Sequence, residues 1–167
     1  RRRDRPDRSR VRPHGSHAAD HAAHQRRSGR RHPADRDGDR VLVWHDHDPA
    51  TGEVVAVPLA GGIEFGETGE QAIRRELKEE IGSAPKSVRY LGLLEDIFEW
   101  AGRKRHELFL IYDVELADRA LYAADEVEVT ESDGSSYLAY WRPLSDFVAS
   151  TRLVPDGLID LIVPSRT

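Results

Sequence analysis

The sequence predicts an α+β fold in which a central mixed β-sheet is packed against helices. Several segments rich in β-branched and large apolar residues lie between residues 40 and 143, as expected for strands. One amphipathic helical segment, residues 68–81, interrupts them, and two short helical segments follow the last strand. Strands arranged around one central helix and followed by further helices are typical of a mixed sheet between helical layers.

The length and composition indicate one domain with a buried core. A chain of 167 residues is long enough for one such domain and short for two. It contains no cysteine, which excludes disulfides, thiol nucleophiles and cysteine-ligated zinc. The sequence has neither an apolar run of about 18 residues nor the apolar region of a secretory signal. We therefore expect a cytoplasmic protein that does not associate with membranes.

The N-terminal segment differs in composition from the rest of the chain. The first forty residues hold thirteen arginines and six aspartates, whereas the remainder carries 12 basic and 24 acidic residues. Val11 is the only apolar side chain of this segment larger than alanine or proline, so too little surface can be buried to offset the entropy of folding. We predict a disordered Arg- and His-rich tail at residues 1–39 and one domain at residues 40–167.

Other interpretations of this tail remain open. The arginines could form a basic arm that binds nucleic acid, and four histidines at helical spacing could bind a metal: His14, His17, His21 and His24. The bias toward Arg, Ala, His, Pro, Asp and Gly is also typical of a wrong reading frame of GC-rich DNA. The acidic remainder does not suit contacts with phosphates, so no stable nucleic-acid complex is expected.

Two strands and a glycine turn are predicted after the tail. Residues 40–44 and 53–59 are rich in β-branched residues, and Pro58 places the end of the second strand at an edge or a bulge. Residues 45–52 form a polar loop between them. The glycines that follow at residues 61–66 permit positive φ and a close approach of the backbone to a ligand.

The strongest predicted element is the helix at residues 68–81. Thr68 is a good N-cap, since its side-chain oxygen can accept a hydrogen bond from the first turn. Gly82 can adopt the left-handed conformation that commonly ends a helix. The apolar side chains form one stripe at steps of 1, 4 and 4: Ala72, Ile73, Leu77 and Ile81.

Further strands and helices complete the predicted chain: strands at residues 87–100, 105–116 and 136–143, and helices beginning at Ser145 and covering residues 156–163. A hairpin turn at residues 101–104 joins the first two of these strands. An acidic connection without regular structure, residues 117–134, precedes the third.

Three carboxylates fall on one face of the predicted helix. Glu76, Glu79 and Glu80 lie at positions i, i+3 and i+4, within one turn of each other. Like charges at this spacing repel by roughly 0.2–0.5 kcal/mol per pair. A hard divalent cation is the usual reason for carboxylate oxygens to converge in this way. A solvated helix face is the alternative interpretation of the same three residues.

The fixed positions in this stretch resemble the signature box of the Nudix hydrolases. Residues 61–83 read GGIEFGETGEQAIRRELKEEIGS, and the positions at the family's spacing are Gly61, Glu67, Arg75, Glu76, Leu77, Glu79, Glu80 and Gly82. Ser83 departs from the pattern, which prefers an aliphatic residue there. The order of elements from residue 40 to residue 163 is similar to the whole Nudix domain, which implies an α/β/α sandwich with a central mixed sheet. The family normally has an apolar strand before residue 40, where this chain is polar.

The resemblance implies metal-dependent hydrolysis of a diphosphate bond in a nucleoside diphosphate linked to another group, X. Mg²⁺ or Mn²⁺ would neutralise the diphosphate oxygens and lower the pKa of bound water. The family pattern implies these metal ligands: Glu76, Glu79, Glu80, the Gly61 carbonyl and Glu67. Arg75 would orient a glutamate through a charge-assisted hydrogen bond, which makes it the fourth catalytic residue beside the three helix glutamates.

The sequence leaves the general base and the substrate open. The candidates for the base are Glu64, Glu107, Glu126, Glu128 and Glu131. Phe98, Trp100 or Tyr112 could stack on a nucleobase, and the candidates for substrate binding are Glu107 and Trp100. The expected partner is a small nucleoside diphosphate derivative, and a homodimer remains open. The alternative function is a Nudix-fold module that binds a nucleotide without hydrolysing it; such modules commonly lose carboxylates of the box, and this chain has lost none.

Overall fold

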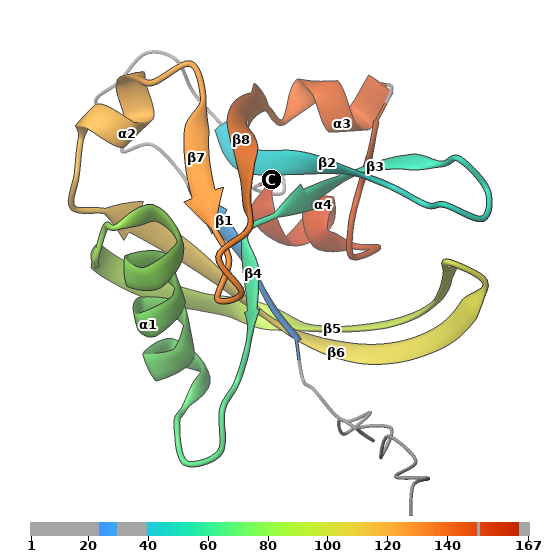
Figure 1. Cartoon of the computed structure of the whole chain (residues 1–167), viewed down its shortest axis with the longest axis horizontal. Coiled ribbons are helices and arrows are strands. Elements are labelled where there is room, and N and C mark those ends of the chain that lie inside the picture. The colour runs from blue at the N-terminus through green and yellow to red at the C-terminus, as the bar shows by residue number, and fades with distance from the viewer. Residues whose placement is uncertain (1–23, 30–39, 150, 164–167) are drawn as a thin grey trace, which may run out of the picture.

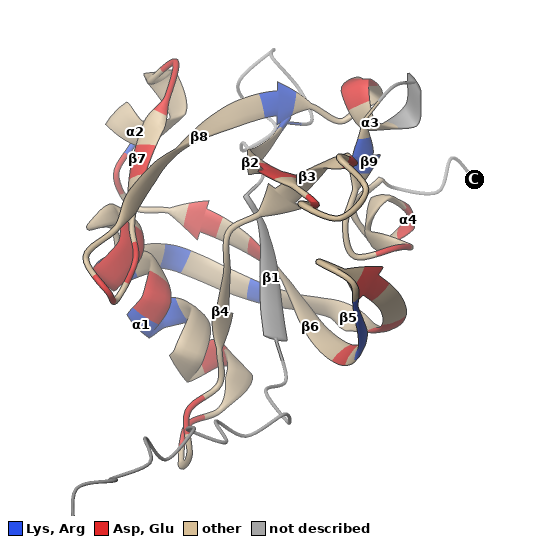
Figure 2. Ribbon diagram, turned by 45° about the vertical axis from the view of Figure 1, so that its right-hand side comes forward, with Lys and Arg blue, Asp and Glu red and all other residues tan. Residues whose placement is uncertain are grey.

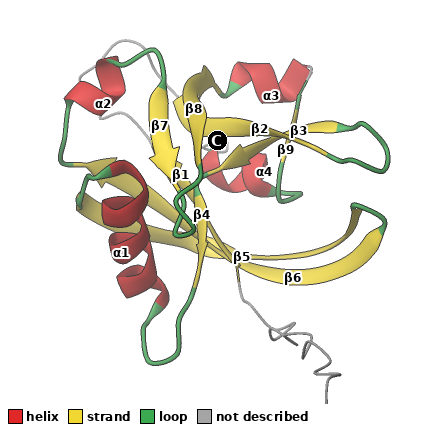
Figure 3. Ribbon diagram, in the orientation of Figure 1, coloured by secondary structure: helices red, strands yellow, loops and turns green. Residues whose placement is uncertain are grey.

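The computed structural model describes residues 24–29, 40–149 and 151–163, in which the chain forms two β-sheets and four helices (Figures 1 and 3). The first sheet has the order β4-β1-β6-β5, with the bounds β1 His24–Gly29, β4 Ala60–Gly62, β5 Pro85–Trp100 and β6 Arg103–Leu116. The second has the order β7-β8-β2-β3-β9, with the bounds β2 Arg40–His47, β3 Val54–Pro58, β7 Val127–Thr130, β8 Ser136–Pro143 and β9 Arg152–Leu153. The helices are α1 Gly69–Ile81, α2 Ala120–Ala123, α3 Ser145–Ala149 and α4 Leu158–Ile162.

Both sheets combine parallel and antiparallel pairs. β1 lies parallel to β6 and antiparallel to β4, while β3 lies parallel to β9 and antiparallel to β2. The predicted α+β class with mixed pairing is confirmed. The strands are divided between two sheets, whereas the sequence led us to expect a single central one.

The alternation of side chains along β2 separates two hydrophobic cores. Leu42 faces the core that contains Leu77 of α1, whereas Val41 and Val43 face the core that contains Leu158 of α4. Successive side chains of a strand point to opposite faces, so the strands lie between α1 on one side and α4 on the other. This is the predicted α/β/α sandwich, and Figure 1 shows α1 and α4 on opposite sides of the strands.

The N-terminal prediction is wrong for residues 24–29. This segment, placed in a disordered tail by its composition, forms β1 and lies between β4 and β6 in the first sheet. Backbone N–H and C=O groups pair in a sheet whatever the side chains are, so a polar segment flanked by two strands can be ordered. Residues 1–23 and 30–39 lie outside the described residues. Most of the predicted disordered tail, basic arm and altered reading frame falls there, as do His14, His17 and His21 of the histidine site.

The central helix confirms the sequence prediction closely. Thr68 is the N-cap of α1 and forms a capping box with Gln71, in which each side chain accepts a hydrogen bond from the other residue's backbone N–H. Gly82 ends the helix in the left-handed conformation, with φ of 67°.

Four further short elements were not predicted from the sequence. β4 is a three-residue strand of alanine and glycine, the acidic connection contains α2 and β7, and β9 is a two-residue strand between α3 and α4. In β7 only Val127 and Val129 are buried. Two apolar positions in alternation are too few to distinguish a strand from a loop.

The hairpin of β5 and β6 extends far beyond the other strands of the first sheet (Figure 1). The two strands pair from Pro85 and Leu116 to Trp100 and Arg103. Ala101 and Gly102 form the turn with φ of 53° and 71°. Two central residues with positive φ are typical of the tight turn that follows the twist of a β-hairpin. The distal half of this hairpin therefore projects beside the second sheet and forms a wall of the pocket described below.

Candidate active site

The glycine turn brings strand β4 against helix α1. A Cβ atom built on Gly61 would overlap the carboxyl group of Glu76, whereas one built on Gly62 would meet nothing within 4 Å. Only glycine at position 61 leaves room for the Glu76 carboxylate against the β4 backbone. The structure thus places the Glu76 carboxylate against the backbone of Gly61.

Arg75 is the centre of a network of carboxylates. Its guanidinium donates to both oxygens of Glu67, over 2.6 and 3.2 Å, and lies 3.1 Å from Glu76 and 3.2 Å from Glu79. It also donates to the carbonyl of Gly62 over 3.1 Å. Figure 2 shows the resulting mixture of acidic and basic residues along α1. Arg75 therefore connects the helix to the glycine turn.

The network shifts two pKa values in opposite directions. Hydrogen bonding to Glu67 is the main cause that raises the pKa of Arg75, and the nearby charge of Glu76 adds to it. The same guanidinium, followed by the backbone N–H of Glu64, lowers the pKa of Glu67. Both shifts favour the charged forms, so this pair holds the glycine turn in place at neutral pH.

The predicted metal ligands occupy different environments. Glu80 is buried at 5% exposure, Glu76 is largely buried, and the Glu79 side chain is 58% exposed. Glu67 uses both carboxylate oxygens on Arg75 and one of them also on the Glu64 N–H. Within the described residues, no three Asp, Glu or His side chains lie close enough together to hold a metal as they stand.

The chemistry of these side chains nevertheless fits a divalent cation. Carboxylate and carbonyl oxygens are the ligands that Mg²⁺ takes in proteins, usually one or two carboxylates with water and phosphate oxygens. The Glu76 carboxylate lies against the backbone of Gly61, where the position without a Cβ makes room for it. A cation at this position would compete with Arg75 for Glu76 and Glu79.

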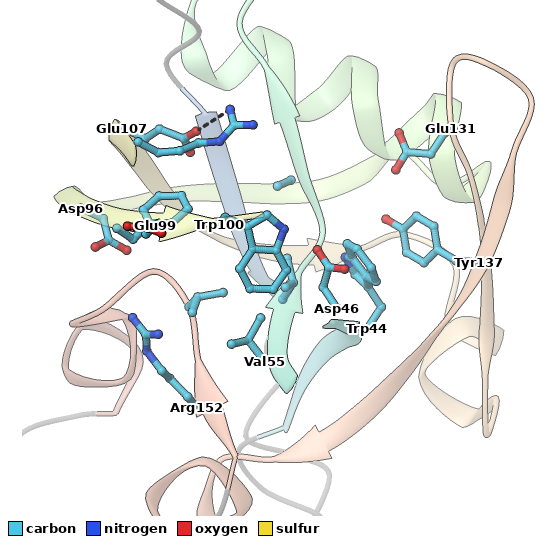
Figure 4. Close-up of a pocket in the computed structure, with 15 residues that line it drawn as sticks. Trp44, Asp46, Val55, Asp96, Glu99, Trp100, Glu107, Glu131, Tyr137 and Arg152 are labelled. Carbon is cyan, nitrogen blue, oxygen red and sulfur yellow. Dashed lines mark ion pairs between the residues drawn. The ribbon is translucent and has the colours of Figure 1, made fainter. Parts of the chain in front are cut away.

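A pocket of about 300 Å³ lies between the two sheets, next to this turn (Figure 4). Its floor is aliphatic, with Val55 and Val57 of β3. Ala60 of β4 also lines it and directly precedes Gly61, so the pocket and the glutamate site share one short strand. The remaining lining residues come from β2, β5, β6, β8, β9 and the connections: Trp44, Asp46, Asp96, Phe98, Glu99, Trp100, Arg105, Glu107, Glu131, Tyr137, Arg152 and Val154.

Besides its aliphatic floor, the pocket is lined mainly by aromatic rings and by carboxylates. The rings of Trp44 and Tyr137 lie 4.7 Å apart between centroids and are tilted by 40°. Glu107 pairs with Arg105 over 3.7 Å, and Arg152 pairs with residues outside the pocket, Glu53 and Asp156. The volume is at the lower end of the range of about 300–1,000 Å³ that is usual for small-molecule sites.

A buried aspartate links two loops beside the pocket. Asp48, 3% exposed in the β2–β3 connection, accepts hydrogen bonds from Ala50 over 2.8 Å and from Ala101 over 3.0 Å. The Ala50 bond is the first cause that lowers the pKa of Asp48. Because Trp100 directly precedes Ala101, this bond joins the tips of two hairpins, one from each sheet, beside a residue that lines the pocket.

The structure separates the candidates that the sequence left open. Trp100, Phe98, Glu107 and Glu131 line the pocket. Four others are not among its lining residues: Glu64, Glu126, Glu128 and Tyr112. Tyr112 is buried in the α1 core, where burial raises its pKa and its ring contacts Tyr90.

Sequence analysis missed Trp44, Asp46 and Tyr137. Trp44 and Asp46 could have been found from the sequence, because residues two apart in a strand share a face. Both lie on the same face of β2 as the buried Leu42. Tyr137 carried no comparable signal, because its proximity to Trp44 depends on the pairing of β2 with β8.

Comparison with known proteins decides the family. A sequence model of the NUDIX domain matches residues 25–157. The chain belongs to the Nudix family. This Nudix chain is 29% identical to an RNA pyrophosphohydrolase of Marinomonas sp. (strain MWYL1) over 118 residues, which are 63% of this chain and 73% of that protein. It is 32% identical to an RNA pyrophosphohydrolase of Hydrogenovibrio crunogenus over 101 residues, covering 53% of this chain and only 61% of the relative.

The fold of this Nudix chain is also that of a solved structure. The NUDIX hydrolase from Nitrosomonas europaea superposes with a TM-score of 0.54 at 17% identity, covering 83% of this chain and 84% of the other. The domain match and the pyrophosphohydrolase relatives confirm the expected enzyme class, a Nudix-type pyrophosphohydrolase. The match begins at residue 25, inside the segment predicted to be a tail, and therefore includes all of β1 except His24. No helix among the described residues is long and apolar enough to cross a membrane.

Proposed function

We propose that this Nudix protein hydrolyses a diphosphate bond in a nucleoside diphosphate linked to X. The observation that carries the proposal is the shared strand β4: Ala60 lines the pocket and Gly61 contacts Glu76. A substrate with its base in the pocket would then place its phosphates over the glycine turn and the glutamates of α1. Binding and chemistry would take place on two adjacent residues of one strand.

The proposed metal is Mg²⁺ or Mn²⁺, held by Glu76, Glu79 and Glu80 with the Gly61 carbonyl. When bound, it would neutralise the charge of the phosphate oxygens and lower the pKa of a bound water. Glu67 was included among the expected ligands, but its two oxygens are engaged by Arg75. We therefore assign Glu67 to orienting Arg75, which in turn holds the glycine turn against the helix.

The protein side chains would orient the substrate and move the proton. Arg75 fixes the positions of Glu76 and Glu79 through its ion pairs. Of the candidates for the general base, Glu107 and Glu131 line the pocket, so we restrict the proposal to these two. Trp44, Trp100 and Tyr137 supply flat surfaces on which a base can stack.

A second candidate substrate is the phosphorylated 5′ end of an RNA. The names of the relatives favour it, because two proteins about 30% identical to this chain are RNA pyrophosphohydrolases. This candidate bears on the expectation that no stable nucleic-acid complex forms. A short-lived contact through the terminal nucleotide alone would reconcile it with the acidic composition of residues 41–167, which suits few phosphate contacts.

The test is a metal-dependent screen with product identification. Nucleoside triphosphates, nucleotide sugars and 5′-triphosphorylated oligonucleotides are incubated with and without Mg²⁺ or Mn²⁺, and the products are separated by chromatography. Release of a mononucleotide or of pyrophosphate from one class, only with metal, supports the proposal. Binding of nucleotides without turnover of any class would instead support the alternative of a non-hydrolysing nucleotide-binding module.

A further inference from the structure

The pocket between the sheets has two unlike ends. Trp44, Asp46, Tyr137 and Glu131 lie together at one end, and Asp96, Glu99 and Glu107 lie toward the other (Figure 4). The first end combines the aromatic pair with two carboxylates that come from the second sheet and its β7–β8 connection. We refer to these four residues as the aromatic end of the pocket.

The aromatic end offers hydrogen-bond acceptors beside two aromatic rings that are tilted by 40° to each other. Trp44 and Tyr137 pack against the α1 core, which fixes their rings. One oxygen of Asp46 accepts the backbone N–H of His47 over 2.8 Å. Among the described residues, neither Asp46 nor Glu131 forms an ion pair with a basic side chain, in contrast to Glu107 at the other end, which pairs with Arg105. A carboxylate can only accept hydrogen bonds, so a ligand here must donate them.

The pattern of donors distinguishes the nucleobases. Guanine presents two adjacent donors, the ring N1–H and the 2-amino group, which match the two oxygens of one carboxylate. Adenine and cytosine place a ring acceptor next to their amino group, and uracil places carbonyl acceptors on both sides of its N–H. An acceptor facing a carboxylate repels it and leaves both groups desolvated without a partner. Guanine is thus the base that this end fits.

We propose that the aromatic end of the pocket recognises guanine, with its ring stacked on Trp44 or Tyr137 and its two donors on the carboxylate of Asp46 or Glu131. The inference rests on the proposed function in treating the pocket as the substrate site, and it names the substrate class: guanine nucleotides. It makes one of these two carboxylates the residue that determines specificity, and if that residue is Glu131, Glu107 is left as the candidate for the general base.

Binding of nucleosides tests the inference without hydrolysis. Guanosine, inosine and adenosine are titrated into the full chain without metal, and binding is followed by calorimetry and by tryptophan fluorescence. Inosine lacks only the 2-amino group of guanosine. We expect guanosine to bind about tenfold more tightly than inosine, as for the loss of one hydrogen bond to a charged group, and adenosine to bind more weakly still.

Variants identify the carboxylate. Asp46→Asn or Glu131→Gln, whichever carries the contact, should reduce the preference for guanosine over inosine to near one. The matched control is Asp125→Asn, which removes an exposed carboxylate that is not among the lining residues and should keep the preference. Circular dichroism and thermal melts of each variant establish that it is folded.

Two outcomes overturn the inference: equal or unmeasurable binding of guanosine and inosine, or an unchanged preference in both variants. The same proteins are then assayed with GTP, ITP and ATP and with metal. Hydrolysis without discrimination among the bases refutes the inference and leaves the proposed function standing. Preferred binding of guanosine without metal-dependent hydrolysis of any nucleoside triphosphate, nucleotide sugar or 5′-triphosphorylated oligonucleotide refutes the proposed function and leaves the recognition of guanine standing.

Discussion

The glutamate site on α1 and the pocket between the sheets adjoin each other but are built in different ways. The glutamate site lies within residues 61–82, and its bonds join neighbours in the chain, such as Thr68 to Gln71 and Glu67 to Arg75. The pocket takes residues from seven of the nine described strands and from the connections between them. One short segment can therefore carry the chemistry of the family, while the surrounding sheets supply the surface that contacts the rest of the substrate.

The two regions also differ in the interactions that hold their residues in place. Ion pairs and a close backbone contact fix the glutamate site, whereas apolar packing and buried carboxylates such as Asp48 fix the pocket. Changes to the first should reduce turnover, and changes to the second should weaken binding of the substrate. Five variants separate these effects.

The largest effect is expected for Glu80→Gln. Glu80 is buried on α1 and is one of the proposed metal ligands, and the amide retains the shape but lacks the charge that a cation requires. We expect turnover to fall about 100-fold or more, with an unchanged circular dichroism spectrum and unchanged nucleoside binding. Glu70→Gln is the control, because Glu70 is exposed on the same helix and pairs only locally with Arg74. Turnover of Glu80→Gln close to that of the control would remove Glu80 from the metal site.

Removal of β1 should affect the glutamate site from a distance. β1 lies between β4 and β6, so a chain that begins at residue 30 leaves the three-residue β4 without its partner. We expect at least tenfold lower activity and a lower melting temperature than for a chain that begins at residue 23. Equal activity of the two chains would show that β1 has no part in placing Gly61.

Gly61→Ala tests the contact between β4 and α1. The added methyl group would displace the Glu76 carboxylate, so we expect kcat to fall about tenfold with little change in KM. Gly62→Ala is a matched control one residue away, where a methyl group meets nothing within 4 Å. Similar kcat values for the two variants would argue against a role of this contact in turnover.

Asp48→Ala should act on the pocket instead. Loss of the acceptor for the Ala101 N–H frees the turn next to Trp100, so we expect KM to rise several-fold while kcat is retained. Asp48→Asn retains an acceptor oxygen and should restore much of the affinity. Asp118→Ala provides the control, since Asp118 accepts a local hydrogen bond from Ala120 and lies away from the pocket. A fall in kcat at unchanged KM would assign Asp48 to the chemistry instead.

The smallest effect concerns acid stability. The pKa of Glu67 is lowered in the folded state, so its pair with Arg75 stabilises the fold above the ordinary pKa of 4.5, and this contribution is lost as the pH falls below that value. Glu67→Gln should therefore melt below the parent at pH 7, and the difference in melting temperature should shrink toward pH 3. A difference independent of pH would mean that packing, and not the charge, explains the loss.

The glutamate site could be predicted from the sequence because its determinants are local. Thr68, Gly82 and the spacing of the glutamates define the helix and its face without any knowledge of the fold. The resemblance of residues 61–83 to the Nudix box supplied the proposed roles of these glutamates and of Arg75. The one role that contacts revise is that of Glu67, whose position beside Arg75 depends on how the glycine turn bends back on the helix.

The pocket and β1 could not be predicted in the same way. The contact of Trp44 with Tyr137 results from the pairing of β8 with β2, and a single sequence does not state which strands pair. β1 lacks the apolar residues that usually mark a strand, and its order depends on neighbours from distant parts of the chain. Composition shows how much apolar surface a segment can bury. It does not show the backbone hydrogen bonds that two adjacent strands can form with that segment.

The position of β1 also sets the register between the β5–β6 hairpin and the glycine turn. Gln25 pairs with Gly61 on one side and with Leu110 on the other, so one residue of β1 sets the height of the glycine turn relative to β6. A slip of one residue would move the turn by about 3.3 Å along the sheet and reverse which faces its residues present. A change of length inside residues 24–29 should therefore misalign the two halves of the site, even where every residue that contacts the substrate is unchanged.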